Sequence, residues 1–234
     1  MKIVKDFCVL SLDLDWFNFL PGKSSVIYDF FKTLSIYCSL PSTVYVLEEH
    51  HYLMPFILYC SEKFAFAPNI NIINIDEHHD FYNLEFIDFS KSSINCGNFF
   101  AFMVHHDLLQ DYTWICNEKH SISSREDLTR NISYAKDKKV KKFCDSIHIY
   151  GRDEVKSVIE RKKIDQIVVV KSSRYTLYKK MNYPTTCKCL RTTFSDLRRY
   201  KHRKEFLNYK EVIKVKKIFN RPCQLVESLV SSRK

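Results

Sequence analysis

The chain has 234 residues, of which 45% are hydrophobic and 27% are charged, and its formal net charge is +10. This length and apolar content suffice for one sizeable core, and no stretch approaches the roughly 20 apolar residues of a membrane span, so we expect a soluble cytoplasmic protein. Its three glycines exclude a glycine-rich phosphate loop and a dinucleotide fingerprint.

Apolar runs alternate with helical patterns along the first 170 residues. The runs typical of buried strands cover residues 7–12, 43–47, 71–75, 112–116, 146–150 and 166–170. Helical spacing is found over residues 26–38, 56–65, 98–109 and 154–161, while residues 117–142 predict loop and short helix. This alternation favours one α/β domain over residues 1–170, with a mainly parallel sheet and helices on its faces.

The third strand-like run ends in five consecutive ionisable residues, Asp76-Glu77-His78-His79-Asp80. In an extended segment alternate side chains point to the same side, so the D-x-H-x-D spacing places Asp76, His78 and Asp80 together on one side. Two carboxylates and an imidazole suit a hard or borderline divalent cation. Without a cation, the carboxylates should raise each other's pKa. An isolated D-x-H-x-D is equally compatible with a solvated acidic turn.

Two further strand-like runs end in the same residue types. The first ends in Asp13-Leu14-Asp15, and the second ends in Glu48-Glu49-His50-His51. Each alone can be a turn or a helix cap. Active sites of open α/β sheets lie beyond the carboxyl ends of their strands, and three such ends together favour a metal site there.

These residues resemble the motifs of the arginase-like metallohydrolases, the superfamily of ureohydrolases and histone deacetylases, and most closely its peptide arginase branch. Residues 76–80 match the D-x-H-x-D motif, and residues 11–15 resemble S-x-D-x-D. The segment around His50 is similar to the one with the family's lone histidine. Asn95-Cys96-Gly97-Asn98 is similar to the S-G-N turn, with Cys96 in place of serine.

The resemblance covers roughly residues 7–117 and implies a three-layer α/β/α fold with a mainly parallel, arginase/deacetylase-like sheet. In ordinary arginases the D-x-D strand comes late in the chain, whereas here it comes first. The resemblance therefore implies a circular permutation, which folds tolerate because chain termini lie at the surface and often close together.

The resemblance also implies two Mn²⁺ ions and an activity. One ion would be held by His50 and Asp80, the other by His78 and Asp15, with Asp13 and Asp76 bridging. The implied reaction converts peptidyl arginine to ornithine and urea during maturation of a ribosomally made peptide. The alternatives are another amidinohydrolase, a metal-dependent deacetylase, or a non-catalytic protein that binds nucleic acid or an acidic partner.

Further roles complete the expected site. Asp80 would orient the attacking water, His79 would protonate the leaving amine, Glu49 would pair with the guanidinium, and Asn98 would contact substrate. The family's proton-shuttling histidine would fall at Phe100, so that role is vacant or has moved. Other candidates for the proton and guanidinium roles are His51, His105, His106, Glu48 and Glu77.

The charge changes sharply near residue 171. Residues 171–234 hold 18 lysines and arginines against 4 acidic residues. We expect this basic part to pack on the same domain and to attract an acidic leader segment of the peptide substrate. Residues 198–204 interleave basic residues with Tyr200, but without a recognisable nucleic-acid module the nucleic-acid interpretation is the weaker one. Nine cysteines without a C-x-x-C pair are typical of reduced thiols.

Overall fold

The computed structural model of the chain describes residues 7–17, 30, 44–47, 49–64, 69–117 and 124–172. The helix predicted over residues 26–38, except for Phe30, and the basic part after Ser172 lie outside these residues. The described strands are β1 (Cys8–Asp13), β2 (Val44–Leu47), β3 (Ile70–Ile75), β4 (Leu109–Ile115), β5 (Ile147–Tyr150) and β6 (Gln166–Val170). They form one six-stranded sheet, and each neighbouring pair is parallel.

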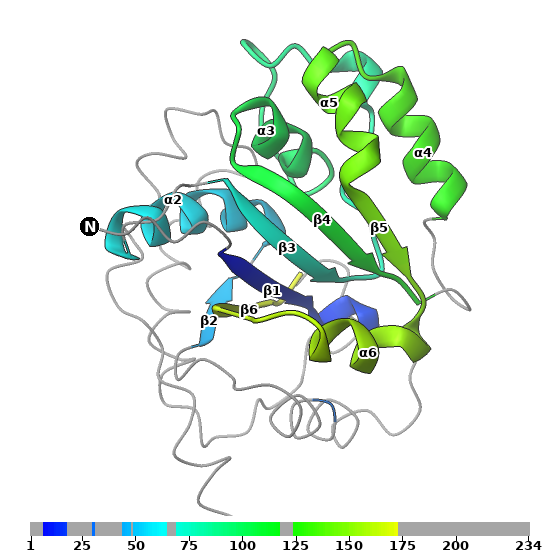
Figure 1. Cartoon of the computed structure of the whole chain (residues 1–234). Coiled ribbons are helices and arrows are strands. Elements are labelled where there is room, and N and C mark those ends of the chain that lie inside the picture. Colours follow the sequence, from blue (N-terminus) through cyan, green and yellow to red (C-terminus); the bar gives the residue numbers. More distant parts are fainter. Residues whose placement is uncertain are drawn as a thin grey trace, which may run out of the picture.

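The strand order is β2-β6-β1-β3-β4-β5, so the last described strand lies between the first two (Figure 1). Leu12 of β1 pairs with Ile75 of β3, while Val170 of β6 pairs with both Asp13 and Leu47. This register brings the carboxyl ends of four strands to the same edge of the sheet. The segments that follow these strands are therefore neighbours in space.

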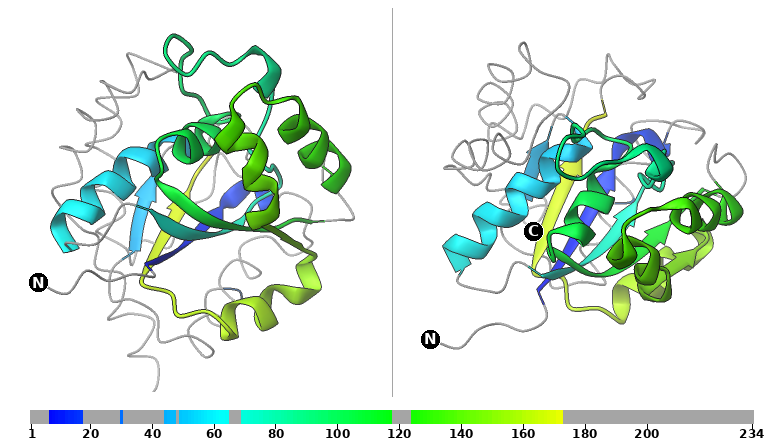
Figure 2. Two further views of the ribbon diagram at one scale, coloured as in Figure 1. Left: turned by 45° about the horizontal axis from the view of Figure 1, so that its top comes forward. Right: turned by 90° about the horizontal axis from the view of Figure 1, so that it is seen from above.

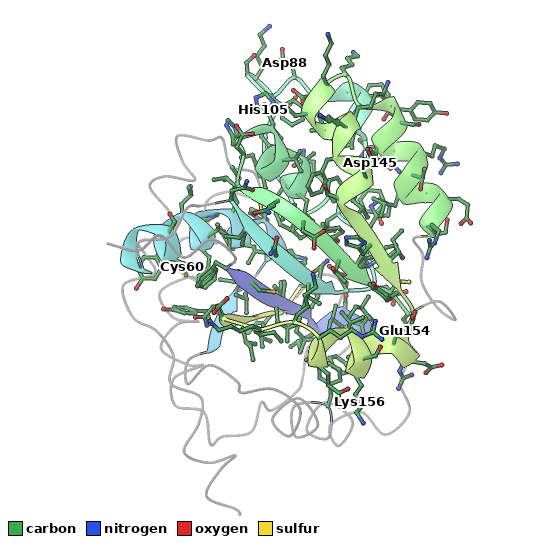
Figure 3. The ribbon with its side chains drawn as sticks, in the orientation of Figure 1. Cys60, Asp88, His105, Asp145, Glu154 and Lys156 are labelled. Carbon is green, nitrogen blue, oxygen red and sulfur yellow. The ribbon has the colours of Figure 1, made fainter. Side chains whose placement is uncertain are left out.

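Helices cover both faces of the sheet (Figures 1 and 2). One face carries α2 (Leu53–Phe64), α3 (Phe99–His105), α4 (Arg125–Tyr134) and α5 (Lys138–Lys142). The other face carries the 3-10 helix η1 (Leu14–Phe17) and α6 (Val155–Glu160). Cys60 on α2 and Lys156 on α6 mark the two sides in Figure 3. The predicted α/β class with a parallel sheet is confirmed.

Alternation along the strands explains their continuous apolar sequences. In β1, Val9 packs in the core under α2 and α3, whereas Leu10 and Leu12 pack in the core under α6. In β3, Ile72 and Ile73 are divided in the same way. Because both faces of a parallel sheet are covered, most side chains on both sides of these strands are apolar, and Ser11 and Asn74 are buried polar exceptions.

Two segments differ from the prediction. Helix α3 ends at His105 and β4 already begins at Leu109, because Asp107 adopts a left-handed conformation (φ 56°), which aspartate tolerates and which ends the helix. Residues 117–142 contain two helices, whose N-caps Ser124 and Asp137 accept hydrogen bonds from the helix backbone. No helix among the described residues is long and apolar enough to cross a membrane.

Candidate metal centre

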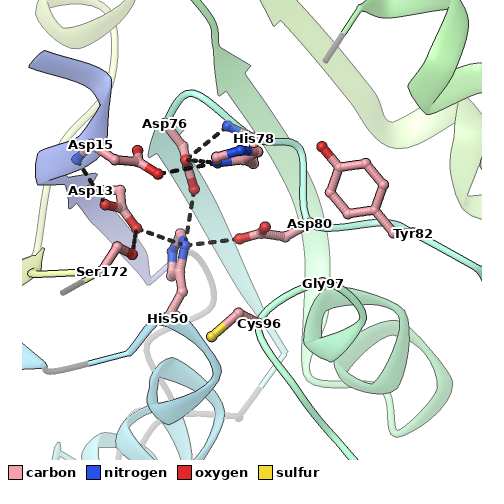
Figure 4. Close-up of a pocket in the computed structure, with 10 residues that line it drawn as sticks. All are labelled: Asp13, Asp15, His50, Asp76, His78, Asp80, Tyr82, Cys96, Gly97 and Ser172. Atoms are coloured by element: carbon pink, nitrogen blue, oxygen red, sulfur yellow. Dashed lines mark hydrogen bonds and ion pairs between the residues drawn. The ribbon is translucent and has the colours of Figure 1, made fainter. Parts of the chain in front are cut away.

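The six predicted metal ligands lie together in one pocket at the carboxyl edge of the sheet (Figure 4). Asp13 ends β1, and Asp15 lies in η1. His50 begins the 3-10 helix η2 (His50–Tyr52), which follows β2. The loop after β3 supplies the remaining three: Asp76, His78 and Asp80. Strand ends that are far apart in sequence therefore contribute to one site, as the sheet register requires.

The first ligand group surrounds His50. Its Nδ1 atom lies 2.9 Å from Asp76 Oδ2 and 2.9 Å from Asp80 Oδ2. Asp13 Oδ2 is slightly further from the same nitrogen, at 3.5 Å. One ligand atom from each of Asp13, His50 and Asp76 lies within 4.8 Å of the others, close enough for a single cation to contact all three.

The second ligand group surrounds His78. Its Nδ1 atom lies 3.1 Å from Asp15 Oδ2 and 3.8 Å from Asp76 Oδ1. Asp76 therefore belongs to both groups, with Oδ2 facing His50 and Oδ1 facing His78. A carboxylate that presents its two oxygens to two ligand groups has the geometry needed to bridge two cations.

Asp13 is oriented toward the first group only. Its Oδ1 atom accepts a hydrogen bond from the Asp15 backbone N–H at 3.1 Å, and its Oδ2 atom accepts one from the Ser172 hydroxyl. The second ligand group consists of Asp15, Asp76 and His78. Asp76 is thus shared by the two ligand groups, whereas Asp13 belongs to the first group and not to the second.

Buried polar groups hold these ligands from behind. The Ser11 hydroxyl lies 2.9 Å from His50 Nε2 and leaves Nδ1 to face the carboxylates. The Asn74 amide donates to Asp76 Oδ2 at 3.2 Å, and the Trp114 indole donates to the Asp76 carbonyl at 3.0 Å. Such outer contacts fix ligand orientation and strengthen metal binding.

Burial and crowding shift the pKa values of the carboxyl groups. Burial, together with the neighbouring Asp15 and Asp76 carboxylates, raises the pKa of Asp13 well above its ordinary value. The pKa of Asp15 is raised by burial and by Asp76, and the same two causes raise that of Asp80 to about 7. The expected rise in pKa is found at Asp13, Asp15 and Asp80 but not at Asp76, whose pKa is lowered.

The histidines partly compensate this negative charge. Burial lowers the pKa of His50, but contacts with Asp76 and Asp80 raise it well above its ordinary value. Burial also opposes ionisation of His78, yet Asp15 and Asp76 raise its pKa to about 9. Burial raises the pKa of Asp76 while the His50 contact lowers it, and the net effect is a lowered value.

The donor set fits a divalent cation. Four carboxylates and two imidazoles share one small pocket, and five of these six side chains are buried. Burying like charges together is costly unless a counter-charge joins them. Oxygen and imidazole ligands suit Mg²⁺, Mn²⁺, Fe²⁺ or Zn²⁺ rather than a soft ion. These groups could therefore hold a metal ion.

His79 lies outside the ten residues that line the pocket and is held by α4. Its Nδ1 atom accepts the Phe81 backbone N–H, so Nε2 carries the proton and donates to Asp127 at 3.0 Å. The ring stacks on Tyr82, which itself lines the pocket. The proton-donor role predicted for His79 does not fit this position, and we assign His79 to positioning the loop that contains Asp80.

Burial holds the pKa of His79 at about 4, against an ordinary value of 6.5, which leads to a pH-dependence prediction. The unfolded chain binds a proton at about 6.5, whereas the folded chain does not, so the stability that His79 contributes is lost as pH falls from 6.5 toward 4. In chelator, the free energy of unfolding of the native chain should fall by roughly 3 kcal/mol more than that of His79→Gln over this range. Denaturant titrations at pH 7 and pH 4 measure this difference, and parallel pH profiles would contradict it.

Glu49 and Asn98 occupy supporting positions. Glu49 is buried behind the pocket wall, where the Cys96 thiol, itself part of that wall, points to Glu49 Oε2 at 3.6 Å. The Asn98 side chain accepts from Asn95 N–H and donates to the Ser93 carbonyl, so it shapes the loop before α3. Neither side chain lines the metal pocket. Glu49 directly precedes the pocket residue His50 in the sequence, and Asn98 directly follows the pocket residue Gly97.

The other histidine candidates are engaged elsewhere. His51 Nδ1 lies 3.1 Å from Cys96 Sγ, next to the pocket wall. His105 Nδ1 lies 2.8 Å from Asp137 Oδ2, and its ring stacks on Phe89 at the far end of α3. His106 follows directly. Both histidines are half-buried, and neither lines the metal pocket.

Three residues that belong to the site or support it were not predicted from the sequence. Ser172 reaches Asp13 because β6 lies beside β1, and Asp127 reaches His79 from α4, in a segment predicted as loop and short helix. Tyr82 lines the pocket two residues beyond the D-x-H-x-D motif. No local pattern marks these residues, although Tyr82 could have been included by proximity to the motif.

Comparison with known proteins yields no match. No protein-family model matches the chain, no curated protein matches it, and no solved structure matches its fold. The geometry of the site and the motifs of the sequence are therefore the basis on which function is inferred.

Proposed function

We propose that the chain is a binuclear metal-dependent hydrolase of the arginase-like type, with a circularly permuted fold, that converts peptidyl arginine to ornithine and urea. The single observation that carries this proposal is the orientation of Asp76, whose two carboxylate oxygens face two separate Asp/His groups. The motif resemblance supports the same ligand set and suggests manganese as the metal.

In this proposal, His50, Asp13, Asp76 and Asp80 hold one cation, and His78, Asp15 and Asp76 hold the other. A cation pair in such a site supplies a water molecule whose pKa is lowered from about 15.7 toward neutrality. The protein's own task is then to orient that water, to position the guanidinium carbon, and to transfer one proton.

Asp80 is suited to the proton transfer. It lies between His50 and Tyr82 at one side of the pocket, and burial with neighbouring Asp76 raises its pKa to about 7 (Figure 4). A carboxylate at this position accepts one proton from the attacking water while the water oxygen bonds to the guanidinium carbon. When the bond from that carbon to the side-chain Nε breaks, the proton held by Asp80 passes to Nε and the proton left on the attacking oxygen follows, so the products are ornithine with a charged amine and neutral urea.

The less acidic wall, formed by Tyr82, Cys96 and Gly97, leaves room for the planar guanidinium. The pocket has a volume of about 120 Å³, which suits a single side-chain group rather than a whole free amino acid with its charged ends. This small size favours arginine presented on a peptide, with its backbone outside the pocket.

The test uses the full chain loaded with Mn²⁺ and a neutral peptide with a single arginine. Urea should be released, and mass spectrometry should show arginine converted to ornithine. Asp13→Asn serves as the ligand-deficient control, and peptides with acetyl-lysine in place of arginine test the deacetylase alternative. Metal-loaded protein that leaves arginine peptides intact but deacetylates lysine would overturn the substrate assignment, and inactivity on both would overturn the hydrolase.

A further inference from the structure

A second pocket lies next to the metal pocket and has a different chemistry. It is lined by Asn83, Asn95 and Asn98, two serines, and the side chains of Phe86 and Ile87. Its volume of about 370 Å³ is larger than that of the metal pocket. Among the described residues, none of those lining it is charged, so it suits neutral amides and apolar groups rather than metal ions or phosphates.

The two pockets share a wall. Tyr82 lines the metal pocket and its neighbour Asn83 lines the second one, while Cys96 and Gly97 of the metal pocket lie between Asn95 and Asn98 of the second. The Tyr82 backbone N–H donates to the Gly97 carbonyl at 2.7 Å and joins the two segments of this wall. The residues lining the second pocket therefore directly adjoin those of the metal pocket on both segments.

The wall is rigidly built. Asn95 Oδ1 accepts the Gly97 N–H at 2.8 Å, and Asn98 Oδ1 accepts the Asn95 N–H at 2.9 Å. A Cβ atom at Gly97 would make contacts of 3.4 Å with both the Asn95 side chain and the Tyr82 ring, so the two segments pack closely here. A preorganised surface of this kind binds a ligand with little ordering cost.

Phe86 is unusual for an aromatic side chain. It is 77% exposed, while the adjacent Ile87 is 8% exposed and anchors the segment in the core. Phe86 lines the second pocket and adds an exposed aromatic surface to its uncharged lining, which the apolar group of a ligand could contact. The other large hydrophobic exposed among the described residues, Tyr134, lies on α4 and lines neither pocket.

We infer that the second pocket is a subsite for the residues that flank the reacting arginine of a peptide substrate. The asparagines and serines offer hydrogen bonds to the peptide backbone, and Phe86 packs against a neighbouring apolar side chain. This inference rests on the proposed function, because it assigns the metal pocket to the arginine side chain. It adds that substrate selection depends on an uncharged segment next to that arginine.

The test compares two substrates in Mn²⁺-loaded full-length protein: Nα-acetyl-arginine amide and a nine-residue neutral peptide with central arginine and flanking leucines. Phe86→Ala should lower kcat/KM for the peptide about tenfold, because an aromatic contact is lost, and leave the capped arginine unchanged. Tyr134→Ala is the matched control, since it removes another exposed aromatic side chain, 58% exposed, that lines neither pocket. Binding of the same peptide with a fluorescent label gives a readout that does not require turnover.

The outcomes separate the two proposals. If both substrates are hydrolysed and Phe86→Ala affects them equally, the subsite is contradicted and the hydrolase stands. If urea is not released but the labelled peptide binds and Phe86→Ala weakens its binding about tenfold, the peptide subsite stands and the hydrolase is contradicted. Absence of both turnover and peptide binding overturns both.

Discussion

Asp76→Asn is expected to remove cation binding at both ligand groups and to lower urea release by on the order of 1000-fold or more, because the metal-activated water is lost. The reason is the shared position of this carboxylate, with one oxygen facing His50 and the other facing His78. Asp15→Asn removes a ligand from the second group only and should leave one cation in place.

Thermal unfolding distinguishes a loss of cation binding in Asp76→Asn from misfolding of the variant. Burial raises the pKa of Asp76, but its contact with His50 lowers it overall, so metal-free Asp76→Asn should be somewhat less stable than the metal-free native chain while still unfolding in one transition. Added Mn²⁺ should raise the melting temperature of the native chain but not that of Asp76→Asn. Asp88→Asn, at an exposed position away from the site, is the control. A full Mn²⁺ response in Asp76→Asn would contradict the bridging role.

The affinity of each ligand group for its cation is expected to rise by about one order of magnitude per pH unit between pH 6 and 8, because each group contains one imidazole. In the metal-free chain the pKa of His78 is about 9 and that of His50 is well above its ordinary value, so both imidazoles carry protons in this range. A cation needs neutral imidazoles and displaces these protons, so the metal-bound form is favoured as pH rises. The dependence should flatten above about pH 9.

Calorimetric titration with Mn²⁺ in buffers of different ionisation enthalpy counts the protons released. About two per chain are expected at pH 7, with a further fraction from Asp80, whose pKa is about 7. His78→Asn should lower the count by about one. Affinity that is the same at pH 6 and pH 8 would show that the imidazoles are not ligands.

The sequence was informative where chemistry depends on local spacing. Three apolar runs ending in acidic residues and histidine predicted that Asp13, His50 and Asp76 meet at one edge, and the parallel register places them there. The alternation argument also predicted that His79 points away from His78. The actual loop is not a simple extended segment, because Asp80 adopts a left-handed conformation (φ 57°) that turns its carboxylate toward His50.

Long-range features were not predictable from local pattern. The position of β6 between β2 and β1 depends on which strand edges remain open after the others pair, and this position brings Ser172 to Asp13. Likewise, Asp127 is one acidic residue among several in a polar segment, and only the packing of α4 places it against His79. Such contacts join residues more than 40 positions apart.

The most direct test of the binuclear centre is the metal content of the full chain purified without chelator and measured by elemental analysis. We predict about two manganese ions per native chain, about one in Asp15→Asn, and essentially none in Asp76→Asn. A native chain that holds no divalent metal, and gains no thermal stability from added Mn²⁺, would contradict the metal centre and with it the proposed hydrolase.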